Sequence, residues 1–391
     1  MIMLFQTPQI PANYAHVIEK IENARKRLRY AISDNLNRWT GFLARMSYAR
    51  AIHGTNSMEG INATFEDAVA VVDGEEPLDP EDQDKAALVG HREAMDYVIQ
   101  LSKEPNFQHN EGTLLGLHYM MMKYDFSKFP GRYRPGPVHV THIPTNEIVY
   151  EGPDHALVPG LMAELIVSLN EKNGTNPIIR AAMAHLNLTM IHPFRDGNGR
   201  MARALQTFVL AREGILDPRF SSIEEYVGKH SQHYYDVLAE VGKGQYNPQR
   251  NALPWIKFCL RAHYSQVNLF VRRMQELDRV WQEFEKLITS RGLPDRTINA
   301  LIKACIKLPI RNPSYRKDAE VSAQVAKRDL KALVDAKLLI PQGVKRGRVY
   351  VGSPEVIAIR QQNLLPVDDD DPFEERTTRE IPEQRSIFEE T

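Results

Sequence analysis

The residues of this 391-residue chain best suited to chemistry lie in one stretch, His192-Pro193-Phe194-Arg195-Asp196-Gly197-Asn198-Gly199-Arg200. Apolar residues recur at three- and four-residue spacing on both sides of it, which predicts a helix through Met190 and another from near Gly199 to just before Gly214. The free N–H groups and positive dipole at the start of the second helix would form an anion site. Glycines would let phosphate oxygens approach the backbone closely.

The polar side chains of the stretch are those that phosphate transfer requires. His192 has a side chain suited to removing a proton from an attacking hydroxyl, and Asp196 offers a hard oxygen ligand for Mg²⁺. Arg200 and Arg203, three residues apart on one helix face, can both bind a polyphosphate. Phe194, apolar within a polar loop, is expected to pin the loop to the core.

Each of these parts is common when it stands alone. A glycine-rich turn between helices is usually a cap, and a histidine beside proline is usually an ordinary surface or core residue. All of the parts fall within twelve residues, in an order that would place base, metal ligand and anion site together. The combination indicates phosphate-transfer chemistry.

The stretch resembles the signature of the Fic family, H-P-F-x-[D/E]-G-N-G-R-x-x-R, and agrees with it at every specified position through Arg203. The resemblance covers roughly residues 45 to 260 and is to bacterial members with an N-terminal inhibitory motif and a C-terminal winged helix. It implies an α-helical Fic fold whose motif loop binds Mg-ATP. It also implies a protein adenylyltransferase, in which AMP passes to a Ser, Thr or Tyr hydroxyl of a protein and pyrophosphate leaves.

The same resemblance implies a role for each matching position. His192 is the catalytic base, Asp196 holds Mg²⁺, and the cofactors are ATP and Mg²⁺. Gly197 to Gly199 form the anion hole, and both motif arginines bind the outer phosphates. The full set expected to bind ATP is Glu59, Arg195, Asp196, Gly197, Asn198, Gly199, Arg200, Met201, Ala202, Arg203, Tyr234 and Tyr235. The tyrosine pair is equally compatible with core packing.

A second motif, Thr55-Asn56-Ser57-Met58-Glu59-Gly60, resembles the family's inhibitory motif, [S/T]-x-x-x-E-[G/N]. The inhibitory residues expected are Thr55, Glu59 and Gly60. In members with this motif the glutamate pairs with the second motif arginine, here Arg203. An arginine held by a carboxylate cannot hold the γ-phosphate, so the motif implies autoinhibition.

The rest of the chain predicts a mainly α fold. Tyr14 to Gly54 reads as one or two long helices, followed by a loop from Glu75 to Asp84. Further helices are expected at Ala86–Leu101, Glu111–Lys123 and Leu157–Leu169, with Asn176 as the N-cap and Pro177 in the first turn of the next.

One segment departs from this helical pattern. Phe129 to Val149 alternates around valines, with Thr145-Asn146 as turn residues, which predicts a β-hairpin that fits the family's target-binding flap. Arg132 and Arg134 within it are open to a structural or a cleft-facing role.

Residues 296–351 carry 13 Lys or Arg against 4 Asp or Glu, a net charge of +9. Helices at Thr297–Ile306, near Asp318–Val325 and at Ala326–Ala336, then two short strands around Lys345-Arg346-Gly347-Arg348, predict a winged helix-turn-helix. The domains expected are therefore a helical N-terminal region (1–110), a Fic core (111–265), a connecting helix (266–295), a winged helix (296–355) and an acidic, disordered tail (366–391).

Composition sets the cellular context that we expect. The chain is 42% hydrophobic and 25% charged with a net charge of −1, so any attraction to nucleic acid must be local. Cys259 and Cys305 stand far apart, which favours structural thiols in a reducing compartment. With neither a signal peptide nor a membrane-length apolar run, a cytoplasmic protein without membrane partners is expected.

Two alternatives stay open. The same fold can transfer UMP, phosphocholine or phosphate, or can remove AMP from a modified target. Alternatively, the protein is a DNA-binding regulator whose Fic-like domain only senses nucleotide, with the basic segment contacting phosphates. Partners left open are the chain itself as substrate, a second copy in a homodimer, and DNA or another protein bound through the winged helix.

Overall fold

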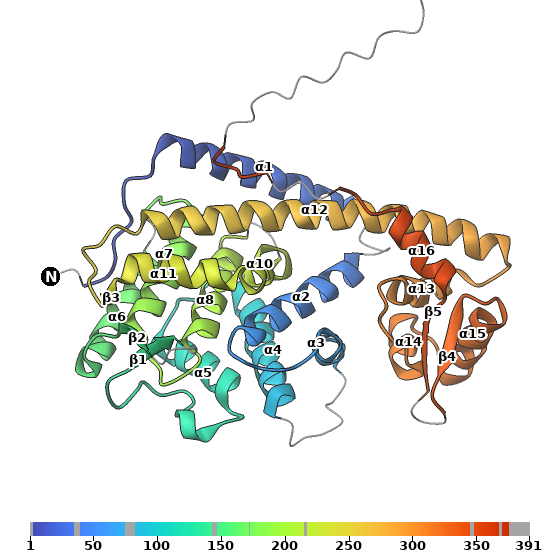
Figure 1. Cartoon of the computed structure of the whole chain (residues 1–391), viewed down its shortest axis with the longest axis horizontal. Helices are drawn as coiled ribbons and strands as arrows, with labels where there is room; N and C mark the ends of the chain where they lie inside the picture. Colours follow the sequence, from blue (N-terminus) through green and yellow to red (C-terminus); the bar gives the residue numbers. More distant parts are fainter. Residues whose placement is uncertain are drawn as a thin grey trace, which may run out of the picture.

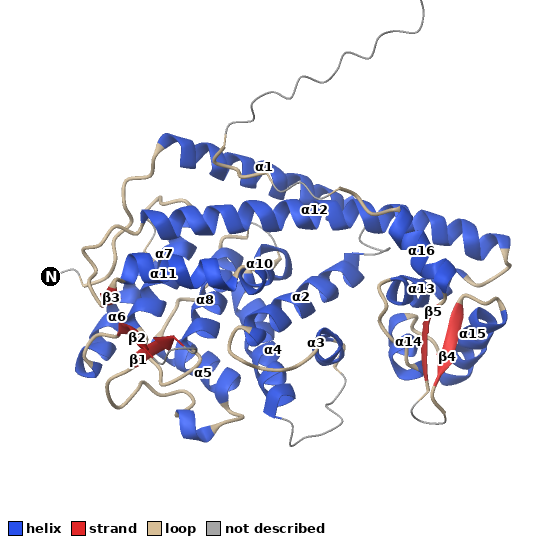
Figure 2. Cartoon of the chain, viewed as in Figure 1, coloured by secondary structure: helices blue, strands red, loops and turns tan. Residues whose placement is uncertain are grey.

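The computed structural model describes residues 3–34, 40–74, 83–142, 147–171, 173–214, 217–344, 348–366 and 370–374. This part of the chain is mainly helical, as predicted, with a small three-stranded sheet and a separate two-stranded sheet (Figure 2). A helical body contains the first twelve α-helices and the three-stranded sheet, and the elements that follow α12 form a C-terminal unit at its far end (Figure 1).

The N-terminal region forms helices at each position where apolar periodicity predicted them. Tyr14 to Gly54 contains two helices rather than one. The region comprises α1 (Ala12–Asp34), α2 (Thr40–Ser57), α3 (Phe65–Val72), α4 (Gln83–Ser102) and α5 (Glu111–Met122). Thr64 starts α3 with a capping box, because its Oγ1 accepts the Asp67 N–H while the Asp67 carboxylate accepts the Thr64 N–H. Most of the loop predicted at Glu75–Asp84 lies outside the described residues.

The predicted hairpin is present. After the 3₁₀ turn η1 (Phe126–Lys128), β1 (His139–His142) pairs antiparallel with β2 (Glu147–Glu151), and β2 pairs in parallel with β3 (Gly244–Gln245). The expected Thr145-Asn146 turn lies outside the described residues.

Three helices follow the hairpin and form the centre of the body. They are α6 (Val158–Asn170, preceded by the 3₁₀ turn η2, His155–Leu157), α7 (Pro177–Ile191) and α8 (Asn198–Arg212). The N-cap prediction for α7 is confirmed, because Asn176 Oδ1 accepts the Ile178 N–H and Pro177 occupies the first turn. Almost every residue of α7 and α8 is buried, so the loop between them is anchored in the core on both sides.

The last helices of the body pack against α2 and the core. They are α9 (Pro218–Ser221), α10 (Glu224–Lys229), α11 (Ser231–Gly242) and the 38-residue α12 (Leu253–Ser290). A Cβ on Gly228 would lie 2.9 Å from the Gly54 Cα, so glycine at these positions lets α10 approach α2. The predicted boundary between residues 265 and 266 falls inside α12, which continues without interruption into the C-terminal unit.

The C-terminal unit begins with three helices and two strands in the predicted order, but the second helix lies earlier than expected and a further helix follows the strands. It contains η3 (Asp295–Thr297), α13 (Ile298–Cys305), α14 (Asn312–Asp318), α15 (Ala323–Asp335), the antiparallel strands β4 (Leu339–Gln342) and β5 (Val349–Gly352), and α16 (Pro354–Gln362). The helix expected near Asp318–Val325 is wrong. Glu320 has a φ of 51°, which ends one helix, and Ser322 then caps α15 by accepting the Val325 N–H. The basic turn at 345–347 lies outside the described residues.

A buried ion-pair cluster fixes the C-terminal unit to α3 and α2. Lys303 Nζ lies 2.9 Å from Asp73 Oδ2 and 2.7 Å from Asp318 Oδ2, and Arg45 pairs with the same two carboxylates. Lys317 Nζ donates to the Asp73 carbonyl. We call these five residues the clasp.

Other predictions about the chain fall at its termini and thiols. Both cysteines are free and buried. Residues 370–374 of the predicted acidic tail pack on the body, with Phe373 against Tyr14 and Asp371 paired with Arg261. Among the described residues, none of the helices combines the length and the apolar character that crossing a bilayer requires.

Candidate active site

The loop between α7 and α8 begins and ends in left-handed backbone. His192 closes α7 with a φ of 51°, and its N–H donates to the Leu188 carbonyl. Gly197 opens α8 with a φ of 75°, and a Cβ there would lie 2.8 Å from Met122 Sδ. Glycine is therefore required at 197 both by its backbone conformation and by the space available.

The imidazole of His192 is held in the form that a general base needs. Its Nδ1 lies 3.2 Å from the Thr189 carbonyl, which can only accept, so Nδ1 carries the proton and Nε2 keeps its lone pair. Burial, the main cause, lowers the pKa of His192 to about 4, with a further contribution from the Arg134 charge. The side chain is therefore neutral at physiological pH and ready to accept a proton.

Arg134 fixes the backbone on which His192 sits. Its side chain is 4% exposed and donates to three carbonyls, those of His192 (2.8 Å), Gly136 (2.8 Å) and Pro153. Its own N–H donates to the Pro193 carbonyl. The role left open for this arginine is therefore structural, joining the start of the loop to the two ends of the hairpin segment.

Phe194 and Asn198 brace the interior of the loop. The Phe194 ring is fully buried, as predicted, and stacks on His118 with 3.7 Å between ring centroids. Asn198 uses its side-chain amide to bridge both backbone groups of Phe194, at 2.9 Å each. His118 Nδ1 accepts the Gly131 N–H, so its Nε2 donates to the Asp196 carbonyl. These buried contacts hold the loop in one conformation.

Asp196 offers one carboxylate beside the start of α8. Its Oδ1 accepts the Gly197 N–H at 2.6 Å, and its Oδ2 lies 3.2 Å from Lys128 Nζ. The described residues contain no cluster of three His, Cys, Asp or Glu that would make a metal cage. One partly exposed carboxylate beside an uncapped helix start fits Mg²⁺, which typically takes its remaining ligands from phosphates and water.

The first turn of α8 supplies donors for an anion. Its N-cap, Gly197, has no side-chain cap, so the N–H groups that follow it lack intrahelical acceptors. Arg200 lies 1% exposed behind this turn, donating from one nitrogen to Met122 Sδ and Tyr124 Oη. Its Nε and second terminal nitrogen have no partner in the structure, which leaves two buried donors for a ligand.

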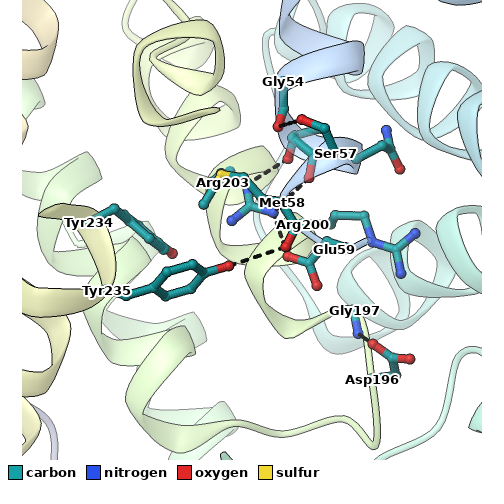
Figure 3. Close-up of polar contacts among 12 residues, drawn as sticks. Gly54, Ser57, Met58, Glu59, Asp196, Gly197, Arg200, Arg203, Tyr234 and Tyr235 are labelled. Carbon is teal, nitrogen blue, oxygen red and sulfur yellow. Dashed lines mark hydrogen bonds and ion pairs between the residues drawn. The ribbon is translucent and has the colours of Figure 1, made fainter. Parts of the chain in front are cut away.

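Arg203, one turn further on, is bound by the segment at Thr55 to Gly60 (Figure 3). Arg203 Nε donates to Thr55 Oγ1 at 2.6 Å, and a terminal nitrogen donates to Glu59 Oε1 at 2.6 Å. Burial alone would lower the pKa of Arg203, but the Glu59 carboxylate outweighs it and raises that pKa. The predicted ion pair between the two residues is therefore present.

The Glu59 carboxylate also covers the start of α8. A Cβ on Gly199 would lie 2.5 Å from Glu59 Oε1, so the carboxylate lies against the first helical turn. Gly60 follows it with a φ of 78°, a conformation that suits the glycine of the motif. A negative group thus occupies the place where the helix start favours an anion.

The remaining predicted ATP-binding residues differ in how far their side chains are exposed. Tyr234 is 1% exposed and packs beneath the Arg203 guanidinium, with its hydroxyl 3.0 Å from His185 Nε2. Tyr235 is 44% exposed and donates to the Met58 carbonyl at 3.3 Å. Arg195 is exposed, with its guanidinium over the Phe129 ring. The side chains of Met201 and Ala202 are fully buried, which leaves them only backbone contact with a ligand.

Sequence reasoning did not find several residues of this site. His118 and Met122 lie on α5 at ordinary helical spacing, and Lys128 lies in a short turn, so no local pattern marks them. All three reach the loop only through tertiary packing. Only Arg134 carried a signal, as part of the hairpin's GRYR run.

Known proteins have sequences similar to the region that contains this loop. Residues 108–210 match the model of the Fic/DOC family. The protein adenylyltransferase Fic of Nematostella vectensis is 24% identical over 266 residues, which cover 68% of this chain and 58% of that protein. Protein adenylyltransferase fic-1 of Caenorhabditis briggsae is 31% identical over 107 residues, 26% of this chain and 21% of that protein. This chain thus spans less than two thirds of the length of these relatives.

Solved structures share the fold. A Fic family protein from Desulfovibrio desulfuricans G20 superposes with a TM-score of 0.58 at 22% identity, covering 89% of this chain and 98% of that one. A Fic domain containing signaling protein from Bacteroides thetaiotaomicron gives a TM-score of 0.53 at 22% identity, covering 67% of this chain and 97% of that one.

Proposed function

We propose that this protein is a protein adenylyltransferase, transferring AMP from ATP to a Ser, Thr or Tyr hydroxyl of a protein; the match of residues 108–210 to the Fic/DOC family model supports this proposal. The observation that carries the proposal is the pairing of a neutral His192 with an uncapped helix start that is bordered by buried, unpartnered Arg200 nitrogens. The names of the relatives support the same activity.

In this reaction the target hydroxyl oxygen attacks the α-phosphorus, and the bond from that phosphorus to the bridging oxygen breaks. His192 Nε2 takes the hydroxyl proton, because Nδ1 already carries one. The N–H groups at the start of α8 and the free Arg200 donors stabilise the phosphate charge, which leaves with pyrophosphate.

Asp196 is the residue that would hold Mg²⁺, and the ion would supply charge neutralisation across the phosphates. Lys128 now neutralises the same carboxylate, with 3.2 Å between Nζ and Oδ2. Both side chains are partly exposed, so this contact is weak enough to be exchanged for a metal. We therefore assign Lys128 a place beside the bound phosphates rather than a fixed pair with Asp196.

Autoinhibition is part of the proposal. Arg203 can bind the outer phosphates only after it leaves Glu59, and the Glu59 carboxylate must also leave the start of α8. The 2.6 Å ion pair and the carboxylate's place against Gly199 support this reading. Both contacts would repel or displace the same phosphates.

The experiment is intact-mass analysis of the full chain after incubation with Mg-ATP, comparing wild type, Glu59→Gly and His192→Ala in the Glu59→Gly background. We expect Glu59→Gly to raise self-modification by about ten- to a hundredfold, the range that typical coupling energies produce. His192→Ala should lower it again by at least about a hundredfold. Glu104→Gly, which changes an exposed glutamate in another turn, is the matched control and should behave as wild type.

Two results would count against the proposal. If Glu59→Gly binds ATP but gains no AMP on itself or on proteins of an added cell extract, adenylyl transfer is wrong. If His192→Ala keeps the rate of the parent variant, the assigned base is wrong. UTP and CDP-choline in place of ATP distinguish the other transfer reactions of the fold.

A further inference from the structure

A second cavity lies outside the candidate active site. It has a volume of about 290 Å³, is open to solvent, and lies where α2, α12, α13 and α16 meet. Ligand pockets commonly begin at about 300 Å³ and often form where structural units meet. None of its lining residues belongs to the α7–α8 loop or to the segment at 55–60.

The charged lining of this cavity is strongly positive. Arg50 of α2, Arg272 and Arg273 of α12 and Arg360 of α16 all line it, against one acidic residue, Glu276. Arg272 and Glu276 form an i,i+4 pair, with 3.7 Å between the nearest charged atoms. Three arginines therefore remain without a partner among the lining residues themselves.

The nearest additional carboxylate is already fully used. Glu225 accepts two bonds from Arg273 at 2.6 Å each, one from Lys229 at 2.7 Å and one from Gln266 at 3.4 Å. A carboxylate has about four acceptor positions, so Glu225 has none left for Arg50.

Arg50 is consequently a half-buried cation that forms no ion pair with a carboxylate among the described residues, although the Glu225 charge acts on it. Its one close contact recorded in the described structure is with the face of the Phe65 ring, 5.2 Å from the centroid. Burial first, then the Arg273 charge and more weakly the Arg360 charge, lower the pKa of Arg50 to about 10, and the Glu225 charge offsets part of this. An anion placed among these guanidinium groups would relieve the repulsion between them.

The rest of the cavity is apolar. Hydrophobic side chains come from both the helical body and the C-terminal unit: Phe42, Leu43, Met46, Leu277, Val280, Ile306, Leu364 and Leu365. Leu364 is 45% exposed, so part of this surface meets water. A purely inorganic ion would leave these side chains without a partner.

We propose that this cavity binds a small amphiphilic organic anion, with its acidic head among Arg50, Arg273 and Arg360 and its apolar body against α2 and α12. The head is a carboxylate, sulfonate or phosphate, because each matches the fork of a guanidinium. The occupant bridges the helical body and the C-terminal unit, since its contacts come from both. Binding at this site does not depend on the proposed adenylyl transfer.

The test is titration of the full chain with anilinonaphthalene sulfonate, an apolar anion whose fluorescence rises in a water-poor site. Wild type, Arg50→Gln and Arg360→Gln are compared, with Arg279→Gln as the matched control, because Arg279 is exposed on α12 and does not line the cavity. We expect about tenfold weaker binding in each cavity variant, the loss of one charge-assisted contact, and an unchanged affinity in the control. Thermal unfolding of each variant identifies any that fails to fold, and the other cavity variant then decides.

Competition by dodecanoate, dodecyl phosphate and inorganic phosphate distinguishes the head groups. Displacement by one or both of the amphiphiles at concentrations where phosphate is inactive supports the proposal. Equal affinity in all four proteins, an equal loss in Arg279→Gln, or no binding to wild type overturns it. Displacement by inorganic phosphate as effective as that by dodecanoate overturns the amphiphilic assignment.

Discussion

Two segments border the start of α8, and they are held in place in different ways. The loop at 192–197 is fixed by buried groups, namely the Arg134 fork, the Phe194 stack and the Asn198 bridge. The segment at 55–60 begins in α2, where Thr55 and Asn56 are buried, and it contacts Arg203 through polar groups of Thr55 and Glu59. The difference separates a loop fixed by buried groups from a segment whose contact with Arg203 an anionic ligand would displace under the proposed function; we call residues 55–60 the releasable segment.

The same contrast appears in protonation. Histidines packed around α7 and α8 stay neutral because burial penalises their charge, whereas the contact from Glu59 to Arg203 is an attraction between charges. Lowering the pH therefore destabilises the region around the loop, because protonation would place a charge on its buried histidines. Anionic ligands would compete with the Glu59 carboxylate for Arg203.

The largest expected effect is acid destabilisation of the folded chain. Burial lowers the pKa of six histidines well below 6.5, namely His91, His109, His118, His185, His192 and His263. Below pH 6.5 these histidines are protonated in the unfolded chain but stay neutral in the folded chain. The free energy of unfolding therefore falls as pH falls. Each histidine contributes about 1.4 kcal/mol per pH unit. Glu224, whose pKa burial raises to about 7, takes up a proton in the folded state and offsets one of them.

The net slope is on the order of 7 kcal/mol per pH unit near pH 5. Urea unfolding at a series of pH values between 7.5 and 5 measures it. His109→Phe keeps the aromatic packing against Phe208 and removes one titrating group, so the slope should fall by about 1.4 kcal/mol per pH unit. A stability that is flat across this range would show that these histidines are protonated in the fold.

The second effect tests the rigid side of the comparison. Arg134→Met leaves three carbonyls without a donor, including that of His192, and should lower the free energy of unfolding by about 3 kcal/mol. Arg132→Met, at an exposed position two residues away, is the matched control and should change it by less than about 0.5 kcal/mol. Chemical denaturation measures both. Equal losses of unfolding free energy in the two variants would mean that the Arg134 side chain does not hold the loop.

The sequence predicts the parts of the site that are local. The motif identifies the loop, its helix start and the partner of Glu59, because one continuous stretch carries all three functions. The motif does not predict that Arg134 binds backbone carbonyls or that His118 stacks on Phe194. Only the folded chain brings these groups close together. Nor does the short α14 have enough apolar periodicity to be found.

The net charge of the C-terminal unit also depends on a contact that the sequence does not show. The net +9 of residues 296–351 favoured phosphate contact, but Lys303 is buried in the clasp, where Asp73 from outside this segment pairs with it. Lys317 also belongs to the clasp. A formal sum over residues cannot tell a cation that faces solvent from one already paired across an interface.

The third effect concerns the clasp, which fixes α3 just after the releasable segment. Lys303→Met leaves Asp73 and Asp318 with Arg45 alone and should lower the free energy of unfolding by about 2 kcal/mol. Lys307→Met, near the end of the same helix but outside the clasp, is the matched control. Hydrogen exchange at residues 55–74 should rise in the first variant only. Unchanged exchange there would show that the C-terminal unit does not position this segment.

The smallest effect is at Tyr235, whose hydroxyl donates to the Met58 carbonyl at 3.3 Å. Tyr235→Phe removes that bond and keeps the ring against Tyr234. The bond is long and partly exposed, so its loss should cost less than about 1 kcal/mol and raise basal AMP transfer by no more than about fivefold. Tyr97→Phe, at an exposed position on α4, controls for loss of a hydroxyl. Because Glu59→Gly removes the ion pair itself, adding Tyr235→Phe to it should change nothing further. A rise in that double variant would mean that Tyr235 acts on the nucleotide rather than on the segment, and the segment would then be held by Thr55 and Glu59 alone.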